Sequence, residues 1–217
     1  MISSIKLYFS YLSINIKSIL QYKASFILMT IGEFLVSFTT FLGIFFIFER
    51  FQSIGRFTYS QVLLCFSIVL MGYSIAECFC RGFIDFSVMI KNGGFDKIMV
   101  RPRNPIIQVL GSKLDLTGIG KIIQALVMLV IAIANINLVW TVSKIITIIF
   151  MLIGGIILFF SLFMINAALC FFTTENIEFV RIFTSGAREY CKYPLEVYGK
   201  GMLRFCTFII PYALIQY

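Results

Sequence analysis

The sequence predicts an all-α integral membrane protein, with an amphipathic N-terminal helix at the membrane interface and about five transmembrane helices. Three observations support this class. Of the 217 residues, 60% are hydrophobic and 13% charged, whereas soluble domains are about 45–50% apolar and about 25% charged. Uncharged apolar stretches long enough to cross a bilayer recur along the chain. Basic residues gather between alternate stretches, as the positive-inside rule requires.

Residues 1–23 form the expected interfacial segment. Between positions 2 and 20, apolar residues recur at steps of three and four, and serines and lysines occupy the other side of the helix. A helix of this kind lies in the plane of the membrane surface, where its lysines reach anionic headgroups. Membrane lipid is therefore an expected partner of this segment.

Residues 24–217 form the expected transmembrane domain. Its spans are predicted at about 24–48, 57–78, 116–136, 145–172 and 201–217. Because about 20 apolar residues suffice to cross a bilayer, the fourth span is longer than necessary and is expected to tilt, or to bend near Gly154-Gly155. The fifth is short and remains apolar to the last residue, so we expect a C-terminally truncated sequence or a further span.

The positions of lysine and arginine predict a cytoplasmic N-terminus. In this orientation fifteen of the 18 basic residues face the cytoplasm, and Arg50, Arg56 and Lys144 face outside. The segment between the second and third spans and the segment 175–200 are then both cytoplasmic. This bias also accounts for the net charge of +8, so binding to nucleic acid is not expected.

The residue types argue against catalytic, cofactor-binding or metal sites. The chain has no histidine, and its six cysteines follow no metal-binding or redox spacing and are expected to be small buried hydrophobes. The stretch TGIGK at 117–121 resembles the end of a phosphate-binding loop, but Asp115 and Ile122 stand where that loop needs glycine and a hydroxyl residue. Any ATP hydrolysis is therefore expected on a partner.

The basic segment GGFDKIMVRPRNPIIQVLGSK at 93–113 interrupts this apolar chain. Pro102 and Pro105 stop a helix from running through it, and Gly93-Gly94 allows a bend before it. Two short amphipathic helices at the membrane surface would make a knob that is charged outside and apolar beneath. Such a knob suits a groove on a cytoplasmic partner. The alternative is a loop held to anionic lipid by its arginines, and the physics of the residues does not decide between them.

Two stretches resemble a known family, namely FDKIMVRPRNPIIQVLGSK at 95–113 and REYCKYPLEVYGKGMLRFCTFIIPYALIQY at 188–217. Both are similar to permeases of the type-two exporter group of ABC transporters, in particular the compact six-span branch encoded beside a separate ATPase. The recognisable elements are the turn Arg101-Pro102-x-x-Pro105, the pair Tyr193-Pro194 followed by Tyr198, and Pro211. The likeness covers essentially the whole chain, but the sixth span and the hairpin before it are missing, which reinforces the expectation of truncation.

This resemblance implies a non-enzymatic permease subunit in a bacterial inner membrane. It implies an ABC ATP-binding subunit that carries the ATP, and a second copy or sister permease. Together they would export an unknown drug-like, peptide or lipid substrate by alternating access. The loop at about 91–108 would be the coupling element, and its expected ATPase contacts are Phe95, Asp96, Lys97, Arg101, Pro102, Arg103 and Pro105. The alternative function is a non-transporting membrane protein, such as an immunity or assembly factor; an intramembrane enzyme is disfavoured.

Charged residues within or beside the spans have two interpretations each. Glu33, inside the first span, is a candidate for the substrate path or the permease interface; alternatively it lies near the headgroups or pairs with a structural base. Glu77 and Arg81 are spaced for an i,i+4 pair, which Asp85 extends. The charges of alternating sign in 175–200 predict a solvated helical face, with a second ATPase-facing or gating surface as the alternative.

Overall fold

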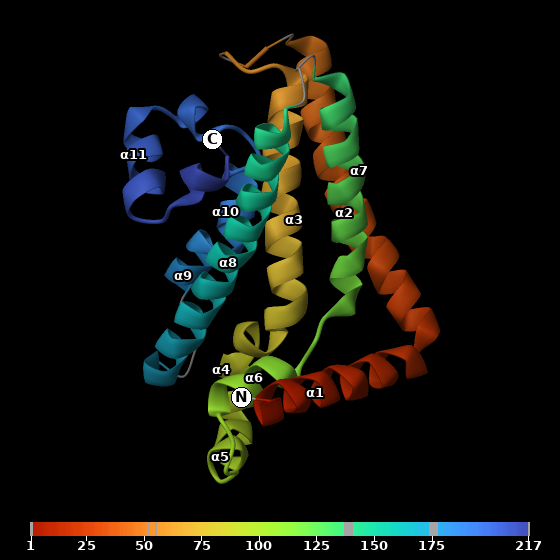
Figure 1. Ribbon diagram of the computed structural model, residues 1–217, viewed down its shortest axis with the longest axis vertical. Coiled ribbons are helices and arrows are strands. Elements are labelled where there is room, and N and C mark those ends of the chain that lie inside the picture. Colours follow the sequence, from red (N-terminus) through yellow and green to blue (C-terminus); the bar gives the residue numbers. More distant parts are fainter. Residues whose placement is uncertain (1, 52, 55, 137–140, 174–177, 217) are drawn as a thin grey trace.

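A computed structural model describes residues 2–51, 53–54, 56–136, 141–173 and 178–216 (Figure 1). These residues are helical and contain no β-strand, apart from an isolated bridge between Ile54 and Phe57. The α-helices are α1 (Ile2–Gln21), α2 (Lys23–Arg50), α3 (Tyr59–Ile84), α4 (Phe86–Lys91), α5 (Gly94–Met99), α6 (Pro105–Ser112), α7 (Ile119–Asn135), α8 (Val142–Thr173), α9 (Glu178–Phe183), α10 (Ser185–Tyr190) and α11 (Lys200–Phe208). Short 3-10 helices are η1 (Leu116–Gly118), η2 (Leu195–Tyr198) and η3 (Tyr212–Ile215).

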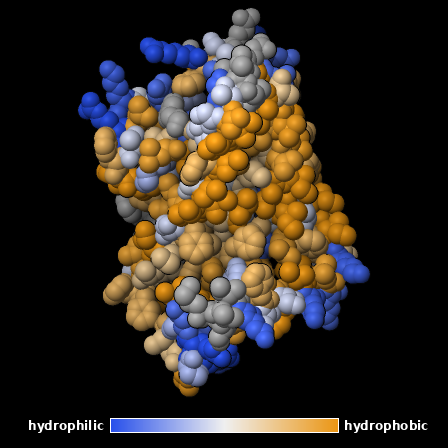
Figure 2. All heavy atoms as spheres, in the orientation of Figure 1, coloured by the Kyte–Doolittle hydropathy of each residue, from blue (hydrophilic) through white to orange (hydrophobic). Residues whose placement is uncertain are grey.

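Four helical stretches of the described chain are long and apolar enough to cross a membrane, namely α2, α3 together with α4, η1 together with α7, and α8. They run roughly lengthwise through the molecule, and α1 lies across one end at a steep angle to α2 (Figure 1). Hydrophobic side chains cover the middle of the face in Figure 2, and hydrophilic ones gather toward its ends. The predicted all-α membrane class is therefore confirmed, and α1 has the orientation expected of an interfacial helix.

Helix α3 is the centre of the bundle, with one buried cluster on each side. On one side, residues such as Leu63 and Phe66 pack with Met128 of α7 and Ile44 of α2. On the other side, α3 packs against α8 and the C-terminal segment. A Cβ on Gly72 would lie 3.1 Å from a backbone carbon of Gly155, so α3 and α8 touch backbone to backbone, as small residues allow between membrane helices.

In the segment 181–198 one side packs against the bundle, whereas Arg181, Glu189 and Glu196 are exposed, so the predicted solvated face is present only on the charged side. Figure 1 shows α9 and α10 beside α8, with α10 near the middle of α3. Ala187, Cys191 and Leu195 have no exposed surface and belong to the buried cluster. Their apolar contacts explain the position, which the alternating charges concealed. Residues 175–177 of that prediction lie outside the described residues.

The predicted fifth span at 201–217 differs in the structure. Helix α11 has 9 residues, about 14 Å of helix, which is less than half of the ~30 Å hydrocarbon thickness. The chain then turns at Pro211, which a helix interior does not tolerate. After the turn, Tyr212 and Ile215 are buried in the cluster that contains Phe159 of α8. The described part of 201–217 therefore forms short pieces, of which η3 packs against α8 and α11 packs against η2 and η3.

Candidate functional site

The predicted knob is present as two short helices, α5 and α6, at the end of the molecule where α1 lies (Figure 1). Gly93 precedes α5 with φ of 63°, a left-handed conformation that glycine adopts without strain. The side chain of Asn104 caps α6 by accepting a hydrogen bond of 2.9 Å from the backbone N–H of Ile106. Pro105 occupies the first turn of α6, where its missing N–H costs nothing. These local signals explain why the chain forms a knob here.

The knob is anchored to the spans by apolar contacts. The ring of Phe95 packs edge-on against Phe86 at 5.2 Å and against Phe171 of α8 at 5.7 Å between centroids. On the other side of the knob, α3 and α6 approach so closely that a Cβ on Gly82 would lie 1.9 Å from the carbonyl oxygen of Val109. Displacing the knob therefore displaces the ends of α3 and α8.

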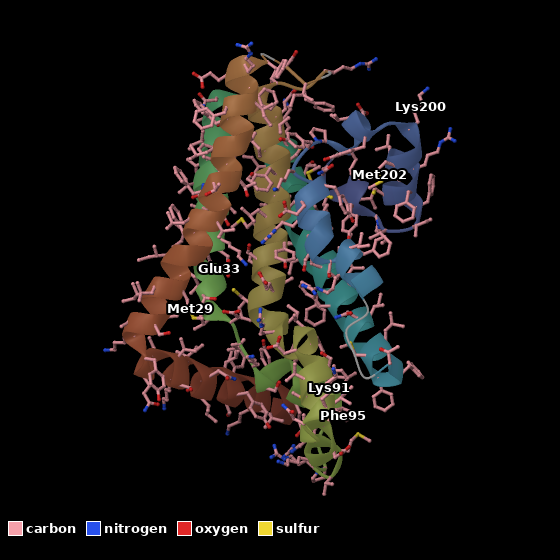
Figure 3. All side chains as sticks on the ribbon, turned by 180° about the vertical axis from the view of Figure 1, so that it is seen from behind. Met29, Glu33, Lys91, Phe95, Lys200 and Met202 are labelled. Atoms are coloured by element: carbon pink, nitrogen blue, oxygen red, sulfur yellow. The ribbon has the colours of Figure 1, made fainter. Side chains whose placement is uncertain are left out.

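The predicted contact residues separate into two groups. Six are exposed at the end of the molecule, and these are Asp96, Lys97, Arg101, Pro102, Arg103 and Pro105. Phe95 is half-buried and turned toward the bundle (Figure 3), so it anchors the knob and does not form its outer surface. Arg101 also donates a hydrogen bond of 3.4 Å to the hydroxyl of Tyr11, which connects the knob to α1.

Behind the knob, a buried lysine joins three spans. Lys121 of α7 is almost fully buried, and its Nζ lies 3.0 Å from Glu33 of α2 and 2.9 Å from Glu77 of α3. The hydroxyl of Tyr73 lies 3.4 Å from Glu77 and donates to it. An ionisable group at this depth is stable only when it is paired, and here one ammonium group serves two carboxylates. Glu33 thus has the structural pairing that was the alternative to a place on the substrate path.

The ionic network continues toward the knob. Arg81 on α3 lies 3.9 Å from Glu77 and 3.3 Å from Asp85, which are the i,i+4 contacts expected from the sequence. Arg81 also lies 3.3 Å from Asp115, in the segment before α7. Asp85 in turn contacts Lys113, which follows α6. Charged contacts therefore run from the end of α6 through α3 to α7 and α2.

Sequence reasoning found part of this network and missed its centre. The pairs formed by Arg81 follow helical spacing and are readable from the sequence. Lys121 is one of the fifteen basic residues expected on the cytoplasmic side, and nothing local shows that it faces Glu33, 88 positions earlier on another helix. The one indication in the sequence that Lys121 is buried is that an uncharged run of apolar residues follows it directly. The network holds helices together and offers no nucleophile or proton-transfer pair to a substrate.

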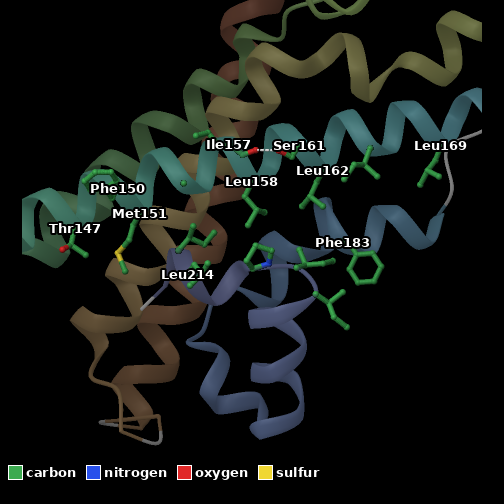
Figure 4. A pocket seen from close by; sticks show the side chains of 16 residues that line it. Thr147, Phe150, Met151, Ile157, Leu158, Ser161, Leu162, Leu169, Phe183 and Leu214 are labelled. Carbon is green, nitrogen blue, oxygen red and sulfur yellow. Dashed lines mark hydrogen bonds between the residues drawn. The ribbon is translucent and has the colours of Figure 1, made fainter.

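A second feature is an apolar cavity of about 890 Å3 between α8 and the C-terminal segment (Figure 4). Phe183, Pro211 and Leu214 line one side of it. Its two hydroxyl side chains, Thr147 and Ser161, donate to carbonyl groups of their own helix. The cavity thus presents hydrocarbon surface without a polar group for recognition.

The described residues include no group of three or more His, Cys, Asp or Glu side chains placed to hold a metal ion. All six cysteines are free and buried, as the sequence predicted. The arrangement is that of a multi-pass membrane protein whose surface knob is mechanically joined to its spans.

Residues 34–217 match the family model described as ABC-2 family transporter protein. The chain therefore belongs to the ABC-2 transporter membrane family, whose members are permeases without catalytic activity of their own. The resemblance seen in the sequence is confirmed. No curated protein and no solved structure gives a significant match to this chain.

Proposed function

We propose that this chain is the membrane-spanning permease subunit of an ABC exporter, driven by ATP hydrolysis on a separate subunit. The observation that carries the proposal is the knob, which is exposed and charged outside and continuous with four spans inside. Family membership implies the ATPase partner, and the knob is the surface that suits it. The substrate is an amphipathic or apolar molecule of the drug, peptide or lipid kind, moved by alternating access.

The distribution of basic residues supports a cytoplasmic knob. Eight lysines and arginines belong to the end of the molecule where α1, α5 and α6 lie (Figure 1). They are Lys6, Lys17, Lys23, Lys91, Lys97, Arg101, Arg103 and Lys113. Five belong to the segments toward the other end, namely Arg50, Arg56, Lys144, Lys200 and Arg204. The excess at the knob end favours a cytoplasmic position for the knob and the N-terminus, in the plasma membrane of a bacterium.

Coupling would follow from the contacts described above. A groove on the ATPase would hold the exposed side of the knob, and closure of the ATPase dimer would push it. Phe95 and Gly82 would transmit the push to α8 and α3, and Arg81 and Lys121 would carry it to α7 and α2. A second copy or a sister permease would complete the pathway, as the family implies.

The test is co-purification from the native membrane in mild detergent. We expect an ATP-binding subunit to accompany the wild-type chain, and the double variant Arg101→Glu/Arg103→Glu to lose it by about tenfold or more, because like charges facing each other across an interface are strongly unfavourable. Lys200→Glu, a charge reversal toward the opposite end, is the matched control and should change nothing. Undiminished capture of the ATPase by the double variant would refute the coupling assignment.

The same experiment separates the rival function. An immunity or assembly factor would bring down its own target through the basic segment, and no ATP-binding subunit. Membrane insertion of both variants, measured by extraction with carbonate, shows that a loss of partner is not a loss of membrane insertion.

A further inference from the structure

Three ionisable side chains lie at the level where the spans have their midpoints. They belong to α10 and the residues after it, and they line a small cavity whose opposite walls are α2 and α3. The lining consists of Val36, Ser37, Thr40, Phe66, Leu70, Arg188, Glu189 and Lys192. Ser37 stands near the middle of α2, and Leu70 stands near the middle of α3. The cavity therefore lies near the midpoints of two helices that are long enough to cross the membrane.

The charges in this cluster do not balance. Arg188 contacts one carboxylate oxygen of Glu189 at 3.2 Å, and the ammonium group of Lys192 contacts the other oxygen. Two cations thus share one carboxylate, and the remaining lining residues are uncharged. The guanidinium of Arg188 also lies over the ring of Tyr73, 5.3 Å from its centroid, a contact that holds a cation in place. The cluster has one surplus positive charge.

A surplus charge at this depth needs an anion. Ionisable groups inside membrane proteins are costly, and they face a partner charge, a water-filled cavity or a substrate. The side chain of Glu189 is 52% exposed, so the cluster is reachable from outside the subunit. Figure 3 views the face on which α2, α3 and α10 meet.

The size of the space and its surroundings define the ligand. The cavity holds about 40 Å³, and about 10–15 Å³ of such volume is enough for one water molecule, so it admits a small head group of a few heavy atoms. Next to it, Leu35 and Val36 of α2 are more than half exposed and provide an apolar surface. A molecule with an anionic head and a hydrocarbon tail fits both parts.

We propose that Arg188 and Lys192 bind the anionic head group of a single-chain amphiphile, with Ser37 and Thr40 as hydroxyl neighbours, and that this is the chemical class of the transported substrate. The binding site is inferred from the charges and the cavity alone. Its use in transport rests on the function proposed above.

The test is direct binding of radiolabelled laurate to the purified chain in dodecyl maltoside. We expect saturable binding. Unlabelled laurate should displace the radiolabelled laurate, whereas dodecanol and dodecylammonium, which have the same tail, should not. Arg188→Gln/Lys192→Gln should weaken laurate binding by about tenfold or more, because charge-assisted hydrogen bonds are lost. Glu189→Gln should strengthen it, because the internal competitor for both cations is removed.

The opposite signs of these two changes exclude a general loss of structure. Lys200→Gln is the matched control, since Lys200 does not line the cavity, and all variants should elute as the wild type does in size exclusion. If dodecyl phosphate displaces radiolabelled laurate better than unlabelled laurate does, the preferred head group is a lipid-type phosphate within the proposed class. If unlabelled laurate displaces it better, the preferred head group is a carboxylate.

Equal laurate binding by wild type and Arg188→Gln/Lys192→Gln would overturn the proposal, as would tighter binding of dodecylammonium than of laurate. If laurate does not bind and the wild-type chain forms a dimer that this double variant dissociates, the cluster is a contact between two copies. That result would also overturn the proposal. The binding assay contains no ATPase, so its failure leaves the co-purification result untouched. If laurate binds but no ATPase co-purifies with the chain, the role in transport is refuted and the binding site stands.

Discussion

Removing the buried lysine at the junction of three spans is the sharpest test of the ionic network. Lys121→Met keeps the length and most of the volume of the side chain, and takes away the ammonium group shared by Glu33 and Glu77. The two carboxylates then lose their common partner. The variant leaves the surface knob unchanged.

The expected loss follows from the burial of each carboxylate. Breaking a buried ion pair by removing one partner costs about 3–5 kcal/mol. The side chain of Glu33 is 37% exposed and can turn toward water, whereas that of Glu77 is 15% exposed. Glu77 keeps its contacts with Tyr73 and Arg81. The free energy of unfolding should therefore fall by about 3 kcal/mol, the lower end of that range.

For a chain of 217 residues, a loss of this size lowers the melting temperature by about 6–12 °C. Thermal unfolding in dodecyl maltoside, followed by circular dichroism, measures it. The double variant Lys121→Met/Glu77→Gln should regain about half of the loss, because the more deeply buried carboxylate is then neutral. A single variant as stable as the wild type would show that the carboxylates do not depend on Lys121.

Three further substitutions test the connection between knob and spans. Gly82→Ala should lower both the melting temperature and ATPase co-purification, because its methyl group would meet the Val109 carbonyl at 1.9 Å; unchanged capture would argue against tight α3–α6 docking. Phe95→Ala should destabilise the chain by about 2 kcal/mol, less than the 3–5 kcal/mol of a fully buried phenylalanine, which a denaturant titration measures. Glu33→Gln should change transport more than expression, because Lys121 keeps its ion pair with Glu77 but loses the one that joins α7 to α2. Identical transport in vesicles would leave Glu33 a purely structural role.

The features that could be predicted from sequence are those fixed by local patterns. Uninterrupted apolar runs specify α2, α3, α7 and α8, because the membrane solvates them directly. The alternation of serine and lysine with apolar residues specifies α1. Gly93 and Pro105 specify the two short helices of the knob, since each fixes backbone geometry where it stands.

The features that could not be predicted depend on pairing between distant segments. Alternating charges look the same in a solvated helix and in the broken segment α9–α10, where Ala187 and Cys191 face the core between them. Hydropathy averages over a window, so it did not register the turn at Pro211 that divides the expected fifth span. The partner of Glu33 is set by how α2 and α7 cross, and no local signal encodes that crossing.

The backbone contact between Gly72 and Gly155 fixes α3 close to its own midpoint. Gly82, where the knob meets α3, stands ten positions after Gly72, and Val62 stands ten positions before it. The arm toward Val62 is about 15 Å of regular helix, whereas the arm toward Gly82 bends at Cys80, where the backbone leaves helical geometry (φ −103°, ψ 15°). A displacement of the knob therefore reaches the pivot through this bend, and the part of α3 before Cys80 tilts so that its two ends move in opposite directions.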